Sequence, residues 1–367
     1  MKVVLFIDSL TSGGAQRQLC CLARLLQKRG CDVCILVYYP HNFFVTMLAE
    51  EPSVPVHLIK WKGQLNRLFK IRRFVCDYRP DVLVSFLEVP CFLAELSRLT
   101  IPHRFRLIAS ERNNDIRSPK RYDWVRLIMH FFAHHVVSNS HAQARWLCRF
   151  APWLKSSTSI ITNCVDLDHF KPIGTHARLS GDSEINIVVV ARYETQKNGI
   201  ALIDALALYR EEQGDLPNLK VNWYGNDPDP AAGMLVGMQE RIKDLELSDC
   251  IQLNPSIQNV VEIYQSADAL CLVSLHEGCA NVVCEAMACG LPVVVTKAGD
   301  NEYLVEDGIT GILIKEYHAD SIAQGLLQFS RLSREQRISF SEHARKRAEK
   351  LLSPEEFFQK WNQAMNC

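Results

Sequence analysis

The sequence lacks an excess of charge of either sign, and it lacks any apolar run long enough to span a membrane. Its 41 Lys and Arg residues balance 41 Asp and Glu residues, so no overall field would attract nucleic acid. The first apolar run ends at Asp8, before the apolar region of a signal peptide is complete. No later run approaches the roughly 20 residues of a transmembrane helix. These absences predict a cytoplasmic protein that is not integral to a membrane and binds no nucleic acid.

The sequence also lacks the spacing of a metal site. Cys31 and Cys34 form a pair, but no second pair follows at the spacing of a zinc site. Asp227 and Asp229 have a spacing that suits a divalent ion, yet the prolines beside them favour a turn. The 14 cysteines are scattered through apolar segments, which is typical of reduced thiols in a core. We therefore expect no bound metal.

What the sequence does have is a regular alternation of short apolar runs and helical patterns. Six runs in each half predict strands, namely 3–7, 33–38, 82–86, 106–109, 136–138 and 159–162, then 185–190, 219–223, 251–253, 269–273, 292–296 and 311–314. This alternation is the signature of parallel sheets covered by helices. It predicts two Rossmann-like α/β domains that face each other across a cleft, with ligands at the carboxyl ends of the strands.

The domain boundary is expected in the segment 166–183, which is rich in Asp, Pro, Gly and Ser and shows no sustained periodicity. We place the first domain at residues 1–170 and the second at 171–353. The last segment, 354–367, has apolar residues at helical spacing and predicts a helix that completes the first domain.

The most informative segment follows the apolar run 269–273. Gly278 supplies a flexible turn, and Asn281 stands where a helix would begin. The backbone amides of Asn281, Val282 and Val283 at such a helix start can bind a diphosphate. Glu285 lies one turn further along on the face of Asn281, from which its carboxylate can accept the hydroxyls of a ribose.

Three charged residues complete this predicted site. Glu277 stands in the loop before the helix, where a carboxylate can bind the hydroxyls of a sugar. Arg192 and Lys197 follow the run 185–190, and their positive charges suit a departing nucleoside diphosphate. Taken singly, either cation would be interpreted as a solvated surface charge.

These segments resemble the retaining glycosyltransferases of family four, which carry two Glu residues with seven residues between them. Here the pair is Glu277 and Glu285, and Glu285 opens the sequence Glu-Ala-Met-Ala-Cys-Gly-Leu-Pro. The resemblance covers nearly the whole chain and implies the GT-B architecture. It implies that Arg192, Lys197 and Glu285 bind the donor phosphates and ribose, that Glu277 meets the donor sugar, and that no metal cofactor is needed. Asp300 and Asn301 depart from the small residues that the family has at these positions.

The first half carries the expected acceptor residues. Gly13 and Gly14 follow the first apolar run and permit close backbone approach at a helix start. A tight turn is the alternative, whereas the resemblance favours a loop in which both glycines meet the acceptor and Gly14 also meets the donor. Glu111 and Arg112 lie among the polar residues 110–114 and are expected to contact the acceptor, with a loop ion pair as the alternative.

Relatives carry a histidine that touches the donor sugar, and no residue here is matched to it. His134 and His135 are instead interpreted as packing or surface residues. The stretch 60–74 interleaves basic and apolar residues, which predicts peripheral contact with an anionic membrane. A helix with a solvated face is the alternative.

The resemblance implies transfer of a hexose or N-acetylhexosamine from a nucleotide diphosphate sugar, such as a UDP-sugar. The acceptor would be a glycan or a polyprenyl-linked glycan of cell-envelope polysaccharides such as lipopolysaccharide or capsule. A nucleotide-sugar epimerase of the same fold and a non-catalytic subunit that binds sugar nucleotides are the alternatives. A glycosidase with two carboxylates is disfavoured by the phosphate-binding residues around Glu285.

Overall fold

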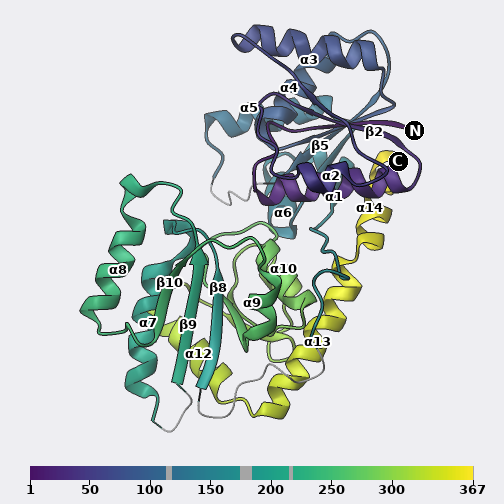
Figure 1. Ribbon diagram of the computed structural model, residues 1–367. Helices are drawn as coiled ribbons and strands as arrows, with labels where there is room; N and C mark the ends of the chain where they lie inside the picture. Colours follow the sequence, from purple (N-terminus) through teal and green to yellow (C-terminus); the bar gives the residue numbers. More distant parts are fainter. Residues whose placement is uncertain (113–117, 174–183, 215–217, 367) are drawn as a thin grey trace. The chain divides into compact units, whose positions relative to one another are not determined.

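The computed structural model describes residues 1–112, 118–173, 184–214 and 218–366 and divides the chain into two compact units (Figure 1). The first unit comprises Met1–Cys164 and Pro354–Cys367, and the second comprises Val165–Ser353. The chain enters the second unit earlier than the expected boundary at 170, because Val165 and Phe170 are buried in the core of that unit. Most of the expected linker, 174–183, lies outside the described residues.

The first unit is built on a parallel sheet whose described strands have the order β3-β2-β1-β4-β5-β6-β7. The strands are β1 (Lys2–Phe6), β2 (Asp32–Val37), β3 (Val56–Leu58), β4 (Val82–Phe86), β5 (Arg106–Glu111), β6 (His135–Ser138) and β7 (Thr158–Ile160). The helices are α1 (Gly14–Lys28), α2 (Val45–Ala49), α3 (Gln64–Tyr78), α4 (Glu88–Arg98), α5 (Arg121–Met129), α6 (His141–Phe150) and α14 (Pro354–Asn366). Two 3-10 turns, η1 (His130–Phe132) and η2 (Pro152–Ser157), follow α5 and α6.

The prediction of six strands in this half was wrong, because β3 was missed. This strand has only three residues and lies at the edge of the sheet, with His57 and Leu58 exposed. Such a short, partly polar segment carries no periodicity that would predict a strand.

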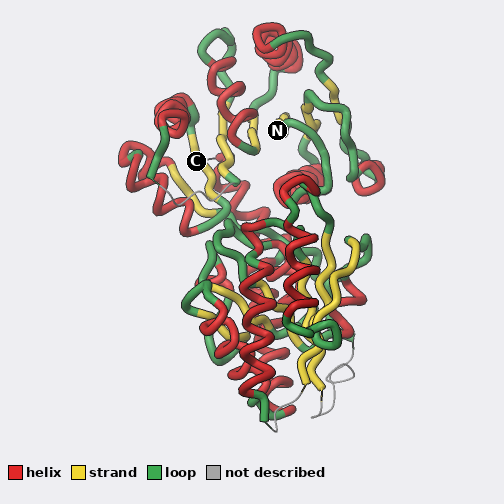
Figure 2. The backbone as a smooth tube through the Cα atoms, turned by 90° about the vertical axis from the view of Figure 1, so that its left-hand side faces the viewer, coloured by secondary structure: helices red, strands yellow, loops and turns green. Residues whose placement is uncertain are grey.

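Helices cover both faces of this sheet (Figure 2). Successive side chains of a strand point to opposite faces, so Val3 and Leu5 join one core cluster and Val4 and Phe6 join another. The cluster of Val3 also contains Trp361 of α14, so the C-terminal helix packs on the first unit. The cluster of Val4 contains residues of α3 and α4.

The second unit is built on a parallel sheet whose described strands have the order β10-β9-β8-β11-β12-β13. The strands are β8 (Glu184–Val190), β9 (Asn218–Gly225), β10 (Ile251–Pro255), β11 (Ala269–Leu272), β12 (Val293–Thr296) and β13 (Gly311–Ile314). The helices are α7 (Gly199–Glu212), α8 (Met234–Asp244), α9 (Val261–Ser266), α10 (Asn281–Ala288), α11 (Asn301–Leu304), α12 (Ala319–Ser330) and α13 (Arg334–Leu352), with 3-10 turns η3 (Thr195–Lys197) and η4 (Pro230–Ala232).

The predicted fold class, two α/β units each built on a parallel sheet covered by helices, is confirmed. In the second unit the strand order changes direction between β8 and β11, which lie side by side in the sheet. Ligands of such sheets bind beyond the carboxyl ends of the strands at this switch point. In the first unit the same change occurs between β1 and β4. None of the described helices is both long and apolar enough to cross a membrane.

Candidate active site

Lys197 and Glu277 meet at the switch point of the second unit. The Lys197 Nζ atom lies 2.6 Å from Glu277 Oε1, and both side chains are largely buried. Gln196 joins the loops that carry them, because its carbonyl oxygen accepts the backbone N–H of Leu275 at 2.9 Å. Its side-chain amide also donates to the carbonyl oxygen of His276 at 2.7 Å. The loops after β8 and β11 are therefore tied together at the base of the ion pair.

Gly299 lets a third loop approach this pair. Its φ angle is +60°, and a Cβ atom there would collide with the carbonyl oxygens of Glu277 and Gly278. The next residue, Asp300, donates its backbone N–H to the carbonyl oxygen of Gly278 at 2.9 Å. The loop after β12 thus supports the segment that carries Glu277, and it can do so only because residue 299 has no side chain.

Helix α10 begins at Asn281, where the sequence predicts it. The backbone N–H of Cys284 donates to the carbonyl oxygen of Ala280 at 3.2 Å, so the amides of residues 281–283 precede the helical ladder. The first turn of α10 contains no acidic residue, which leaves the positive end of the helix dipole for an anion. The Val283 side chain is buried in the core, so only its backbone amide can serve such a ligand.

Glu285 occupies the second turn of α10 and is nearly buried. The Tyr264 hydroxyl of α9 donates a hydrogen bond to Glu285 Oε2 at 3.1 Å. Because Tyr264 is itself fully buried, its hydroxyl fixes the orientation of the carboxylate. Tyr264 could not be predicted from the sequence, since no local pattern indicates that α9 packs beside α10.

Arg192 has a different partner from Lys197. Its guanidinium lies 2.9 Å from the carboxylate of Glu194, and its side chain is half exposed. The strand end beside it is tightly packed, because a Cβ atom at Gly225 would collide with the carbonyl oxygen of Ala191. Arg192 therefore lies at the edge of the switch point, and close packing against Gly225 restrains the backbone just before it.

Asp227 and Asp229 form a turn, as the neighbouring prolines indicate. The backbone N–H of Asp229 donates to Asp227 Oδ1 at 3.2 Å. Within the described residues, no group of three His, Cys, Asp or Glu side chains is arranged to hold a metal ion.

In the first unit, α1 begins at Gly14 with Gly13 as its N-cap. No side chain caps this helix start, and its first turn contains no acidic residue. A Cβ atom at Gly13 would collide with the side-chain amide of Gln16. Because this is the far end of a flexible side chain that can rotate away, space alone does not require glycine here. The helix start presents backbone amides beyond the end of β1.

The sequence predicted that Glu111 lies in a loop after the strand 106–109, but the structure places it within the strand. Glu111 is the last residue of β5 and is fully buried. Its two carboxylate oxygens lie 2.8 Å from His130 Nε2 and 3.0 Å from Arg126 Nη1. His130 Nδ1 lies 2.6 Å from Glu95 Oε1 of α4. Contact between Glu111 and an acceptor stays a prediction, and it would require this network to open.

The residues of this network shift one another's pKa values. Burial acts to lower the pKa of His130, but Glu95 and Glu111 outweigh it and raise this pKa to about 10. Burial acts to raise the pKa of Glu111, but the hydrogen bond from His130 and the charge of Arg126 outweigh it and lower this pKa. Burial raises the pKa of Glu95. His130 is thus a buried cation at neutral pH, which suits a positioning role and not proton transfer.

Arg112, the residue after Glu111, is also buried but has other partners. It donates hydrogen bonds to Ser110 Oγ at 3.0 Å and to Asn163 Oδ1 at 3.1 Å. Its guanidinium lies 4.5 Å from the centre of the Phe86 ring, which stacks on Trp361 of α14. The C-terminal helix therefore supports the predicted acceptor residue. The adjoining polar residues 113 and 114 lie outside the described residues.

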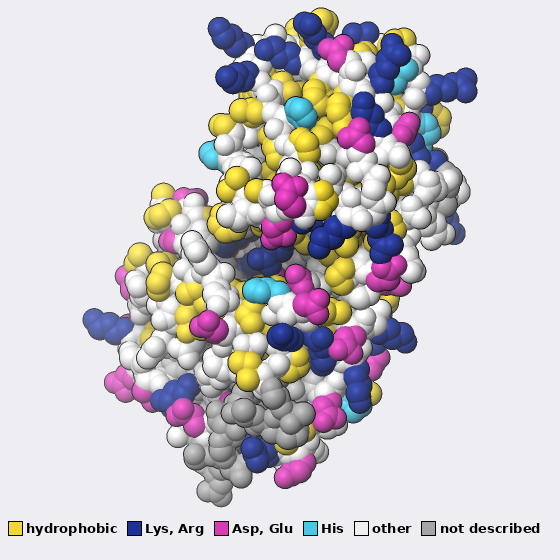
Figure 3. All heavy atoms as spheres, turned by 45° about the vertical axis from the view of Figure 1, so that its right-hand side comes forward, with side chains coloured by type: hydrophobic (Ala, Val, Ile, Leu, Met, Phe, Trp, Pro, Cys, Tyr) yellow, Lys and Arg dark blue, Asp and Glu magenta, His cyan; other side chains and the backbone are white. Residues whose placement is uncertain are grey.

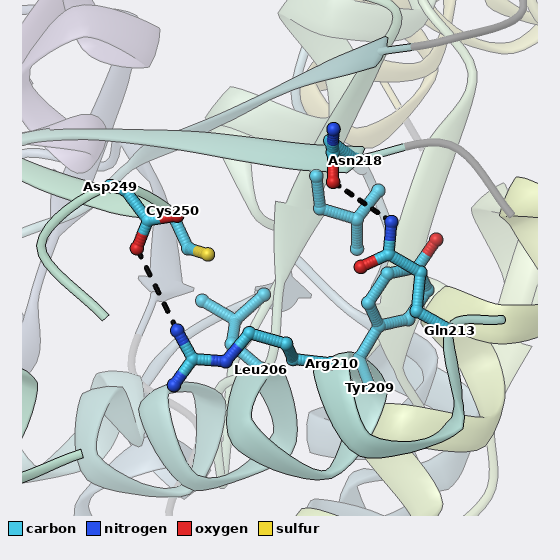
Figure 4. A pocket seen from close by; sticks show the side chains of 8 residues that line it. Leu206, Tyr209, Arg210, Gln213, Asn218, Asp249 and Cys250 are labelled. Atoms are coloured by element: carbon cyan, nitrogen blue, oxygen red, sulfur yellow. Dashed lines mark hydrogen bonds and ion pairs between the residues drawn. The ribbon is translucent and has the colours of Figure 1, made fainter. Parts of the chain in front are cut away.

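A further hollow in the second unit lies at the opposite edge of the sheet (Figure 4). It is lined by Asn218 at the start of β9 and by Cys250 just before β10. Arg210 lies 3.7 Å from Asp249 across it and donates to the carbonyl oxygens of residues 245 and 246. Because these are the amino ends of the strands, the hollow is separate from the switch point.

Two Rossmann-like units, the second with cations, carboxylates and a helix start at its switch point, have the architecture of the GT-B class. The family model described as "Glycosyl transferases group 1" matches residues 176–347, and the model described as "Glycosyltransferase Family 4" matches residues 12–169. The chain belongs to the group 1 glycosyltransferases.

Characterised relatives are distant. The chain is 23% identical over 305 residues to a GalNAc-α-(1→4)-GalNAc-α-(1→3)-diNAcBac-PP-undecaprenol α-1,4-N-acetyl-D-galactosaminyltransferase of Campylobacter jejuni, a match that covers 78% of this chain and 77% of the relative. It is 26% identical over 225 residues to a D-inositol 3-phosphate glycosyltransferase of Saccharomonospora viridis, covering 59% of this chain and 52% of the relative. The match thus spans about half the length of the second relative.

Solved structures share the fold over the whole chain. HepE of Anabaena in complex with UDP has a TM-score of 0.82 at 20% identity, covering 100% of this chain and 99% of HepE. A glycosyltransferase of Rickettsia africae has a TM-score of 0.83 at 18% identity, covering 99% of this chain and 97% of that protein.

Proposed function

We propose that the protein is a retaining glycosyltransferase that moves a hexose or N-acetylhexosamine from a nucleotide diphosphate sugar, such as a UDP-sugar, to a glycan or lipid-linked glycan. The observation that carries the proposal is the Lys197–Glu277 pair at the switch point, in the loops that lead to the start of α10. The pair sets a cation for the leaving diphosphate next to a carboxylate for the hydroxyls of the transferred sugar.

Each residue of the second unit has a defined part in this proposal. The amides of residues 281–283 and Arg192 bind the diphosphate, and Glu285, oriented by Tyr264, accepts the ribose hydroxyls. Negative charge grows on the diphosphate as the sugar departs, so Lys197 stabilises the transition state more than the bound donor. No metal is required, because cations and the helix dipole supply this stabilisation.

The acceptor is assigned to the first unit. Gly13, Gly14 and Arg112 lie beyond the carboxyl ends of its strands, where a glycan hydroxyl can be held for attack. The oxygen of that hydroxyl attacks the sugar on the same face from which the phosphate departs. The leaving phosphate takes the proton of the hydroxyl. The undecaprenol-linked substrate in the name of the Campylobacter relative supports a lipid-linked acceptor and a role in cell-envelope polysaccharide synthesis. Peripheral membrane contact through residues 60–74 belongs to the same proposal.

The test is a panel of nucleotide sugars incubated with the full chain in the presence of EDTA. One donor is expected to bind and to be slowly hydrolysed, and Glu285→Gln and Lys197→Gln are each expected to lose this. Lys315→Gln, at an exposed lysine of the same unit, is the matched control. A requirement for divalent metal, or binding that survives both substitutions, would overturn the proposed site.

The stereochemistry is tested separately. Once a donor and acceptor pair is found, NMR of the product must show the anomeric configuration of the donor. Inversion would exclude the retaining mechanism, and an epimerised free nucleotide sugar would establish the epimerase instead.

A further inference from the structure

Exposed apolar side chains are concentrated on the first unit. Of the eighteen large apolar side chains that are exposed among the described residues, fifteen belong to this unit. The second unit, of similar size, contributes only Ile173, Val236 and Ile309 to that set. Single exposed apolar residues need no explanation, but such an asymmetry between two units of the same fold indicates an interaction surface.

Helix α5 buries a charged side chain and exposes several apolar ones, unlike an ordinary surface helix. Its buried face carries the charged Arg126 beside the apolar Leu127, and the turn that follows buries His130 within the ionic network. Its outer face and that turn expose a stripe of apolar residues at a spacing of three, which is Tyr122, Val125, Ile128 and Phe131, with exposed fractions of 52%, 47%, 56% and 71%. A helix exposed to water alone would place these two sets the other way round.

The stripe continues onto neighbouring helices. Helix α4 packs against both α5 and α3, so the three helices form one layer over the sheet (Figure 1). Helix α3 directs Ile71 and Val75 into the core but exposes Leu65 and Phe69. This apolar surface, which we call the α3–α5 face, therefore extends beyond the stretch 60–74 that the sequence indicated.

The exposed charges of this face are mostly positive. Lys120 and Arg121 are exposed at the start of α5, and exposed cations on and before α3 include Lys62, Lys70 and Arg73. The acids Glu88 and Asp123 are directed at the buried Arg126. On α3 the exposed acid is Asp77, which is paired with Arg73 at 3.6 Å. On the side of the first unit that Figure 3 draws, lysine and arginine side chains are mixed with apolar and acidic side chains (Figure 3).

We infer that the α3–α5 face docks on an anionic lipid bilayer, with the stripe of α5 inserted between headgroups. Aromatic and aliphatic side chains flanked by Lys and Arg suit the membrane interface, where apolar groups enter and cations meet lipid phosphates. A second copy of the chain is disfavoured, because a symmetric contact would set the cations of Lys120 and Arg121 against their equivalents. The inference does not depend on which sugar is transferred.

The test is cosedimentation of the full chain with vesicles of phosphatidylcholine, with and without phosphatidylglycerol, in the absence of donor and acceptor. The wild type is expected to bind the anionic vesicles and to be released by salt. Ile128→Gln with Phe131→Gln is expected to weaken binding by about tenfold or more, from the lost burial of two large side chains. Lys120→Gln with Arg121→Gln is expected to weaken it by about fivefold for each cation.

Matched controls are available on the second unit. Val236→Gln with Ile309→Gln changes two exposed apolar residues, and Lys346→Gln with Lys350→Gln changes two exposed cations. Neither pair is expected to alter vesicle binding. Circular dichroism checks that all variants fold, and donor binding, measured separately, distinguishes failure of this inference from failure of the proposed function.

A second readout follows the stripe directly. Trp124 is exposed beside it, so lipids with brominated acyl chains are expected to quench its fluorescence, and Trp124→Phe should remove that quenching. The inference is overturned if the wild type does not bind anionic vesicles, or if the α5 variants bind as well as the controls. It is also overturned if the wild type is a dimer that the α5 variants convert to monomers.

Discussion

The Lys197 ammonium lies 2.6 Å from the Glu277 carboxylate, although the two residues follow different strands of the second sheet. The pair links the two strand exits of the switch point. In the proposed reaction the carboxylate holds the lysine in place, and the departing diphosphate then meets a preorganised cation.

Lys197→Gln is expected to lower kcat by on the order of 10²- to 10³-fold, the usual effect of removing one group that stabilises developing negative charge. Donor binding should weaken less, because the negative charge on the diphosphate is greatest in the transition state. Steady-state kinetics with the donor identified above would measure both. Lys315→Gln should leave both values unchanged, and an unaltered kcat for Lys197→Gln would remove this lysine from the mechanism.

Gly299→Ala and Gly308→Ala form a matched pair of substitutions. Both glycines have a positive φ angle, +60° and +74°, but only at Gly299 would the new Cβ atom collide with the backbone of residues 277 and 278. Gly308→Ala is expected to cost about 1 kcal/mol of stability and to leave transfer intact. Gly299→Ala is expected to displace the Glu277 loop and to lower activity at least tenfold. Equal activities of the two variants would show that this close approach is dispensable.

Tyr264→Phe tests whether the tyrosine hydroxyl orients Glu285. Loss of this buried hydrogen bond is expected to weaken donor binding by about fivefold, corresponding to roughly 1 kcal/mol, with little change in kcat. Titration calorimetry with the nucleoside diphosphate would measure it. Tyr209→Phe, at another buried tyrosine of the second unit, serves as the control. A donor affinity equal to that of the control would show that Glu285 keeps its orientation without this hydroxyl.

His130→Gln is expected to destabilise the first unit by about 3 kcal/mol or more at neutral pH, because it leaves two buried carboxylates without their shared cation. The folded-state pKa of His130 is about 10, above its ordinary value of 6.5. Its contribution is therefore complete below pH 6.5 and is lost as the pH rises toward 10. The difference in unfolding free energy between wild type and variant should shrink across that window.

Urea unfolding at neutral pH and just below pH 10 would measure this difference. His343→Gln, at an exposed histidine of the other unit, serves as the control for the substitution itself. A constant difference for His130→Gln would mean that His130 is not the cation that binds Glu95 and Glu111.

Much of the second unit could be predicted from the sequence, because the signals are local. Apolar runs mark its buried strands, and the residues that follow them must gather at one edge, since parallel strands share the direction of their carboxyl ends. That rule places Lys197 and Glu277 near each other without any knowledge of the contact. The start of α10 at Asn281 is likewise a local property of the chain.

The tertiary structure decided the features that depend on distant partners. Glu111 looked like a cleft residue by its position after an apolar run, yet partners 15 and 19 residues further along the chain bury its carboxylate. His130 stands among apolar and aromatic neighbours, and nothing local indicates the two carboxylates that charge it. The exposed apolar stripe of α5 could not be predicted either, because the ionic groups that hold the buried face of this helix lie on α4 and β5. Local periodicity thus determined which segments are strands and where polar residues leave them. Long-range electrostatics and packing decided which of those residues are buried and which remain on the surface.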